Sequence, residues 1–102
     1  MPMPDNREDF LLEQDTDVKE PSMYRVLLLN DDYTPMDFVV MILMSVFNKD
    51  RKTAEAIMMN VHKQGRGLCG VYPYEVAETK VNAVRYLADS EKHPLRCVME
   101  EA

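Results

Sequence analysis

The sequence has no apolar run that approaches the roughly 18 residues needed to span a membrane. It also lacks a secretory signal, because Met-Pro-Met-Pro leads into an acidic stretch with neither a basic flank nor an apolar core. Only two cysteines are present, and both Cys69 and Cys97 lie within apolar runs, as small buried side chains do. We therefore expect a cytoplasmic protein in a reducing compartment that makes no contact with membranes.

Metal-binding and catalytic motifs are missing as well. The two cysteines and the two histidines, His62 and His93, show no CxxC or HxxxH spacing, so the pattern does not favour a zinc site. Nucleophilic catalysis by Cys69 with His62 is not favoured either, because Cys69 lies in a predicted strand with no helix N-terminus to activate it. We expect neither a cofactor nor enzymatic activity.

Basic side chains form no patch along the sequence. Residues 1–20 carry seven acidic and two basic side chains, a net charge of −5. The remaining 82 residues carry eleven acidic and ten basic side chains, which leaves only −1 of the total of −6. Because binding to phosphate groups requires a concentrated basic surface, we do not expect nucleic acid as a partner.

The charge distribution divides the chain into two parts. Residues 1–22 are expected to form a flexible acidic N-terminal extension, and residues 23–102 one folded domain, with the boundary at Glu20-Pro21-Ser22. Only Phe10-Leu11-Leu12 interrupts the polarity of the extension. The extension is therefore either a solvated tail or a short peptide offered to a partner.

Hydrophobic periodicity and turn signals predict six elements in the folded domain. Thr34 is expected to cap the first helix and Gly65 to end the second. Strands are expected over residues 23–29, 68–72 and 95–99, and helices over residues 35–47, 50–64 and 73–90. The order β-α-α-β-α-β predicts an α+β fold in which a three-stranded antiparallel sheet packs against three helices.

Two interpretations fit the polar turn after the first strand. Asn30, Asp31 and Asp32 are typical of a strand-to-helix turn, because their side chains bond neighbouring backbone groups. His62, at the edge of the apolar stripe of the second helix, is equally typical of a packed border residue. If the end of the strand meets that helix, however, Asn30, Asp32 and His62 present three acceptors to one point, which would suit a primary ammonium group such as a protein's α-amino group.

Methionine is unusually frequent, with nine among 102 residues. Five of them fall on the first two predicted helices, at Met36, Met41, Met44, Met58 and Met59. They are interpreted as filling of the core, as a deformable apolar surface that accepts several side-chain shapes, or as both.

The chain resembles ClpS, a family of bacterial adaptor proteins. The resemblance covers residues 22–101, and its motifs are long and mutually spaced. They are Met-Tyr-Arg-Val-Leu-Leu-Leu-Asn-Asp-Asp-Tyr-Thr-Pro-Met-Asp-Phe-Val-Val from Met23, Val61-His62, Cys69-Gly70-Val71-Tyr72, the segment 75–81 and His93-Pro94-Leu95. Met41 and Met44 depart from the usual pattern, since they make the first helix more apolar.

The resemblance implies a non-enzymatic adaptor that binds proteins bearing a free N-terminal Leu, Phe, Tyr or Trp, an N-degron. Such an adaptor delivers them to the N-terminal domain of the ClpA unfoldase for degradation by the ClpAP protease. It implies that Asn30, Asp32 and His62, with Asp31 beside them, bind the α-amino group of the substrate. The extension would serve delivery but not capture.

The resemblance also implies roles for eight further residues. Met36 would act as a gatekeeper against β-branched side chains, and Glu75 and Lys80, on an exposed face of the third helix, would contact the unfoldase. The residues expected to line the pocket for the first side chain are Thr34, Met36, Val39, Met58, Val61 and Leu95.

Two other classes of protein stay open at this point. A protein-docking module of the ribosomal-stalk type has a similar size and fold class, and it would show no specificity for an N-terminal residue. A small hydrolase is the third possibility, and it would turn over a substrate.

Overall fold

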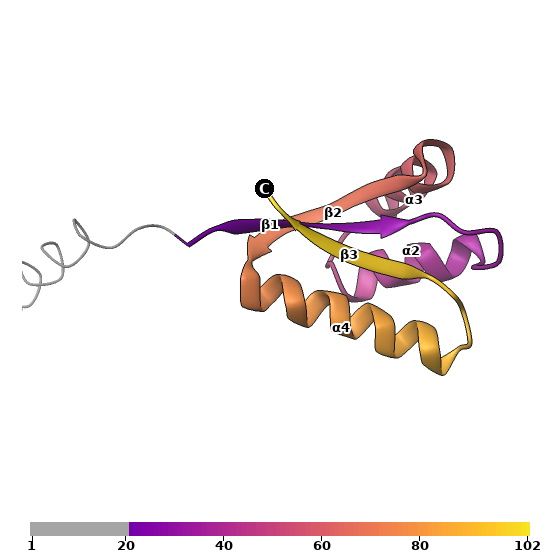
Figure 1. Ribbon diagram of the computed structural model, residues 1–102. Coiled ribbons are helices and arrows are strands. Elements are labelled where there is room, and N and C mark those ends of the chain that lie inside the picture. The colour runs from indigo at the N-terminus through magenta and orange to yellow at the C-terminus, as the bar shows by residue number, and fades with distance from the viewer. Residues whose placement is uncertain (1–20) are drawn as a thin grey trace, which may run out of the picture.

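The computed structural model describes residues 21–102, so the predicted N-terminal extension lies outside the described residues except for Pro21 and Ser22. Six elements follow one another in the order β-α-α-β-α-β (Figure 1). They are β1 (Met23–Leu29), α2 (Met36–Ser45), α3 (Arg51–Gln64), β2 (Arg66–Pro73), α4 (Tyr74–Ser90) and β3 (Arg96–Glu101). The predicted α+β class and element order are confirmed.

The sheet has the strand order β2-β1-β3, and both pairings are antiparallel. Val26 and Leu28 of the central strand are fully buried, because alternate side chains of a strand point to the same face. A β-bulge places Cys69 as the extra residue of β2, between the partners of Val26 and Leu27. The sheet therefore directs one apolar face toward the helices.

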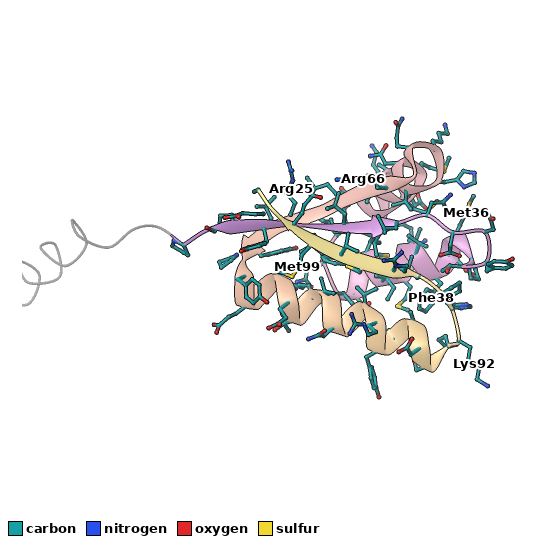
Figure 2. All side chains as sticks on the ribbon, in the orientation of Figure 1. Arg25, Met36, Phe38, Arg66, Lys92 and Met99 are labelled. Carbon is teal, nitrogen blue, oxygen red and sulfur yellow. The ribbon has the colours of Figure 1, made fainter. Side chains whose placement is uncertain are left out.

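On the other face of the sheet, an ionic cluster ties the three strands together. The guanidinium groups of Arg25 and Arg66, both labelled in Figure 2, donate to the carboxylate of Glu100 at 2.9 and 3.2 Å. These side chains are about half exposed, and exposed ion pairs add only about 0–1 kcal/mol to stability. The stability of the sheet therefore comes mainly from its buried face.

The helices supply the rest of the core. Ile42 and Leu43 of α2 and Val84 of α4 are fully buried, and α4 runs along the sheet (Figure 1). The α3 helix begins after Asp50, whose carboxylate accepts the backbone N–H of Thr53 at 2.8 Å, and it ends at Gly65, which has a positive φ of 88°. None of the helices in residues 21–102 is long and apolar enough to cross a membrane.

Candidate functional site

Three segments meet at the carboxyl end of β1. The backbone N–H of Asn30 donates to the carbonyl oxygen of Gly65 at 3.0 Å, which ties the end of β1 to the end of α3. His62 lies in the last turn of α3, three residues before Gly65. The first turn of α2 forms the third side. Asn30 and His62, which are 32 positions apart in the sequence, thus lie at the same end of the fold.

The turn between β1 and α2 is organised by the carboxylate of Asp31. Its Oδ1 accepts the backbone N–H groups of Tyr33 and Thr34, at 2.8 and 2.7 Å, and its Oδ2 accepts the Thr34 hydroxyl at 2.8 Å. Burial alone would raise the pKa of Asp31, but the hydrogen bonds from Thr34 and Tyr33 together hold it below its usual value. The Asp31 carboxylate is therefore ionised at neutral pH and engaged within the turn.

This turn corrects the expected start of the first helix. Thr34 does not cap α2, because its hydroxyl points back to Asp31. Pro35 occupies the N-cap position with no side-chain cap bond, and α2 begins at Met36. Asp32, which takes no part in the bonds of the turn, remains exposed, as do Asn30 and His62.

These side chains surround one cavity of about 250 Å³. Its polar wall comes from the turn and the end of α3, and its apolar wall from α2 and α3. The residues that line it are Asn30, Asp31, Asp32, Thr34, Met36, Val39, Met58, Val61 and His62. The cavity can hold a small cationic group against its polar wall and an apolar side chain against its other wall.

A smaller recess of about 20 Å³ adjoins the cavity, and Leu29 and Leu95 complete its lining. Val39, Val61 and Leu95 are 3–6% exposed and form the floor, whereas Met36 is 46% exposed. Met36 lies at the end of the molecule where β1 leads into α2 (Figure 2). All ten residues predicted for α-amino and side-chain binding thus line these two hollows. Leu29 also lines the recess and was not predicted, although its position directly before Asn30 was an available signal.

The two residues predicted to contact the unfoldase differ in their surroundings. Glu75 is exposed in the first turn of α4, as expected. Lys80 is half-buried instead, because its ammonium group donates to the carbonyl oxygen of Val46 at 2.7 Å and lies 5.7 Å from the centre of the Tyr72 ring. Lys80 therefore caps the C-terminus of α2, where positive charge is favoured.

The cysteines are poorly suited to nucleophilic chemistry. Cys69 is buried, Cys97 is half-buried, and both are free thiols. Burial raises the pKa of each thiol to about 12, so neither forms a thiolate near neutral pH. Across residues 21–102, no three His, Cys, Asp or Glu side chains gather closely enough to hold a metal ion.

Comparison with known proteins places the chain in a family. Residues 19–98 match the family model of the ATP-dependent Clp protease adaptor protein ClpS. The ClpS adapter of Herminiimonas arsenicoxydans is 60% identical over 91 residues, 89% of each chain, and that of Paraburkholderia xenovorans is 55% identical over 98% of this chain and 97% of its own.

A solved structure is similar in fold as well as in sequence. The ClpS2 protein of Agrobacterium tumefaciens, bound to L-phenylalaninamide, superposes with a TM-score of 0.79. It shares 36% sequence identity, and the match covers 81% of this chain and 100% of the other. The chain therefore belongs to the ClpS family of ATP-dependent Clp protease adaptor proteins.

Proposed function

We propose that this adaptor captures proteins through a free N-terminal Leu, Phe, Tyr or Trp and delivers them to the ClpA unfoldase for degradation by ClpAP. The observation that carries the proposal is the cavity at the end of β1, which combines an acidic, acceptor-rich wall with an apolar one. A first residue with its α-amino group offers the matching pair of chemical groups.

The ligand of the similar ClpS2 structure supports this proposal. L-phenylalaninamide carries a free α-amino group, a benzyl side chain and an amide where a protein chain would have its first peptide bond. It is thus a chemical copy of an N-terminal phenylalanine. We transfer the same ligand class to this chain, because the cavity here has a place for each group.

In the proposal, the α-amino group of the substrate binds against Asn30, Asp32 and His62. The group is protonated below its usual pKa of about 7.7–8.0, so it needs a negative charge and acceptors. Asp32 supplies the charge, while the Asn30 side-chain oxygen and a neutral imidazole nitrogen of His62 supply acceptors. Asp31 adds a second negative charge nearby and holds the turn that positions Asp32.

The first side chain then packs against Val39, Met58, Val61 and Leu95, with Thr34 and Met36 at the sides. Burial of one Leu or Phe side chain contributes about 2–3 kcal/mol. Met36, half exposed at the rim, narrows the entrance and disfavours side chains that branch at Cβ. The free α-amino group and the apolar side chain are thus recognised together.

Delivery requires a surface outside the cavity. We assign it to Glu75 and Lys80 of α4 and to residues 1–20 of the acidic extension. An ammonium group has several donors, so the bond from Lys80 to Val46 leaves others for a carboxylate of the unfoldase. We do not propose catalysis by the adaptor itself. The raised pKa values of the Cys69 and Cys97 thiols support a role without catalysis.

An array of peptides that differ only in their first residue and in its acetylation tests the proposal. We expect binding of free N-terminal Leu, Phe, Tyr and Trp and loss of binding after acetylation, because the acetylated group leaves the Asp32 carboxylate without a cation. Equal binding of every peptide would indicate a docking module without N-terminal specificity. Turnover of the peptides would indicate a hydrolase.

A further inference from the structure

The five methionines of the first two helices converge on one groove. A hollow of about 800 Å³ lies between α2 and α3, and Met36, Met41, Met44, Met58 and Met59 all line it. Met36 and Met41 are 46% and 40% exposed. Met44 and Met58 also pack against the core. The methionines therefore serve both interpretations, since they fill the edge of the core and present a deformable apolar surface to the groove.

The groove is continuous with the cavity at the end of β1. Met36 and Met58 line both hollows. The opposite side of the cavity is formed by the exposed polar side chains of Asn30, Asp32 and His62. A chain held by its first residue thus meets a polar rim on one side and a methionine-lined groove on the other.

We infer that this groove holds the second to fourth residues of a bound substrate and that apolar side chains at these positions strengthen binding. The inference rests on the proposed function, because it extends the same site along the captured chain. It adds a preference for sequence context to the preference for the first residue.

The length of the groove sets the number of residues. Met36, Val40 and Met44 follow one another at intervals of four residues along α2, on the side that faces the groove. Eight residues of helix rise about 12 Å, and an extended chain advances about 3.3–3.6 Å per residue. The groove therefore accommodates roughly three residues beyond the one in the cavity.

The walls favour apolar side chains without selecting one shape. Methionine side chains are flexible and polarizable, so they adapt to different partners. The Ser45 hydroxyl donates to the carbonyl oxygen of Met41 at 2.8 Å and lies 3.3 Å from its sulfur, which keeps the Met41 side chain beside this part of α2. At the far end, Arg51 and Glu55 pair at 3.7 Å and give the groove a charged limit.

Two fluorescent peptides test the inference. Both begin with Leu, and they differ only at positions two to four, which are all Leu in one and all Ser in the other. We expect the Leu-rich peptide to bind about tenfold more tightly in fluorescence anisotropy, because three apolar side chains become partly buried. In the double variant Met41→Gln/Met44→Gln, the advantage should fall to about twofold, with unchanged affinity for the Ser-rich peptide.

A matched control is available at Met23. It is 40% exposed, as Met41 is, but it lies in β1 and does not line the groove. Met23→Gln should therefore preserve the tenfold advantage. Equal affinity of the wild-type protein for both peptides, or an advantage that survives in the double variant, would overturn the inference.

Acetylated versions of both peptides test the groove assignment and the proposed function separately. If acetylation abolishes binding while positions two to four have no effect, the groove assignment alone fails. If acetylation has no effect, the proposed function fails, and the inference fails with it. A third outcome is that the wild-type protein and Met23→Gln self-associate, the double variant does not, and no preference exists at positions two to four. This outcome would assign the groove to a second copy of the chain and overturn the inference.

Discussion

Two adjacent carboxylates at the end of β1 illustrate how the surroundings of a residue decide its role. Asp31 and Asp32 are chemically alike, and either could form the turn or face a ligand. Only Asp31 accepts the hydrogen bonds of the turn from Tyr33 and Thr34. Asp32 remains exposed on the cavity wall, so its charge is available to a cationic ligand.

Replacement of Asp32 tests that availability. Asp32→Asn should weaken binding of a peptide with a free N-terminal Leu by about 2 kcal/mol, roughly 30-fold, because the ammonium group loses its counter-charge. The melting temperature should not change, since Asp32 is outside the bonded turn. Asp89→Asn, at an exposed site on α4, serves as the control in the same anisotropy titration. Wild-type affinity in the Asp32 variant would remove this residue from the site.

His62 should make binding depend on pH. An imidazole that accepts a hydrogen bond from an ammonium group loses this ability on protonation, and the resulting cation repels the ligand. We expect affinity for an N-terminal Leu peptide, whose α-amino group is already mostly protonated at pH 7, to fall between pH 7 and pH 5 in the wild-type protein, and to fall less in His62→Ala. Parallel titrations of the two proteins provide the measurement. Equal slopes would contradict a role for His62 as an acceptor.

Asp31 should influence stability in the opposite pH range. Because its pKa in the folded state lies below the usual 3.8, ionised Asp31 stabilises the fold above about pH 4, and this contribution disappears as the pH falls through the folded-state pKa. Asp31→Ala should therefore lower the free energy of unfolding by about 1 kcal/mol at pH 7. Urea unfolding should show a smaller difference at pH 3. An equal difference at both pH values would exclude the ionised form as the cause.

The candidate site could be predicted from the sequence as far as the chemistry of the residue types limits it. The hydrogen-bond acceptors Asn30, Asp32 and His62 could be recognised from their residue types. The surroundings of Lys80 were not visible, because its bond to Val46 joins α4 to a helix end 34 positions earlier. Thr34 was misassigned as a helix cap for a different, local reason, because its hydroxyl donates to Asp31 three residues earlier instead of facing the first turn of α2.

At the scale of elements, the cavity depends on how closely α3 packs against β2. Gly67 lies at their contact, where an added Cβ would be 2.6 Å from the Val61 side chain and 3.2 Å from the carbonyl oxygen of Ile57. Val61 is 3% exposed and branched at Cβ, so it has little freedom to move. A single methyl group at Gly67 would therefore displace a wall of the cavity.

Gly67→Ala should consequently lower both stability and peptide affinity. We expect a loss of about 1–3 kcal/mol in the free energy of unfolding, which is typical of overpacking, together with weaker binding of an N-terminal Leu peptide. Gly65→Ala is the matched variant: its cost, about 1 kcal/mol, comes from the positive φ of 88°, and an added Cβ there meets nothing within 4 Å. If both variants bind alike, the packing of α3 does not control the cavity.

Local sequence signals predicted the first and last residues of the helices and strands with small differences from the structure. The strand over residues 23–29 and the end of the second helix at Gly65 are as expected. Strand β2 runs from Arg66 to Pro73, longer than residues 68–72, because pairing with β1 recruits flanking residues that have little strand character of their own. Leu95 precedes β3 and lines the recess near the cavity instead of pairing in the sheet.

At the scale of the whole molecule, the proposed function assigns capture to the cavity and a share of delivery to the acidic extension. The cavity and its groove lie within residues 21–102, which carry little net charge, whereas most of the net charge of −6 belongs to residues 1–20. This separation supports the assignment of binding to the domain and of a share of delivery, beside that of Glu75 and Lys80, to the acidic segment. It also allows the two activities to be removed independently.

Deletion of residues 1–20 should therefore spare peptide binding and impair degradation. We expect affinity for an N-terminal Leu peptide within about twofold of the full chain, because no cavity residue is lost. Degradation of a protein with the same first residue by ClpAP should slow severely in the same preparation. The control replaces the acidic residues of the extension with Ser and Gln at unchanged length. Full degradation by the truncated protein would refute the delivery role.

The sequence by itself determined the fold class, because hydrophobic periodicity and turn residues act over a few neighbouring positions. It also carried the residue types of the cavity and the motifs of the family. Only the tertiary structure decided that Asp31 holds the turn, that Lys80 caps α2, and that five methionines line one groove beside the cavity. These facts depend on contacts between distant elements or between competing neighbours, and packing of the whole chain selects among them.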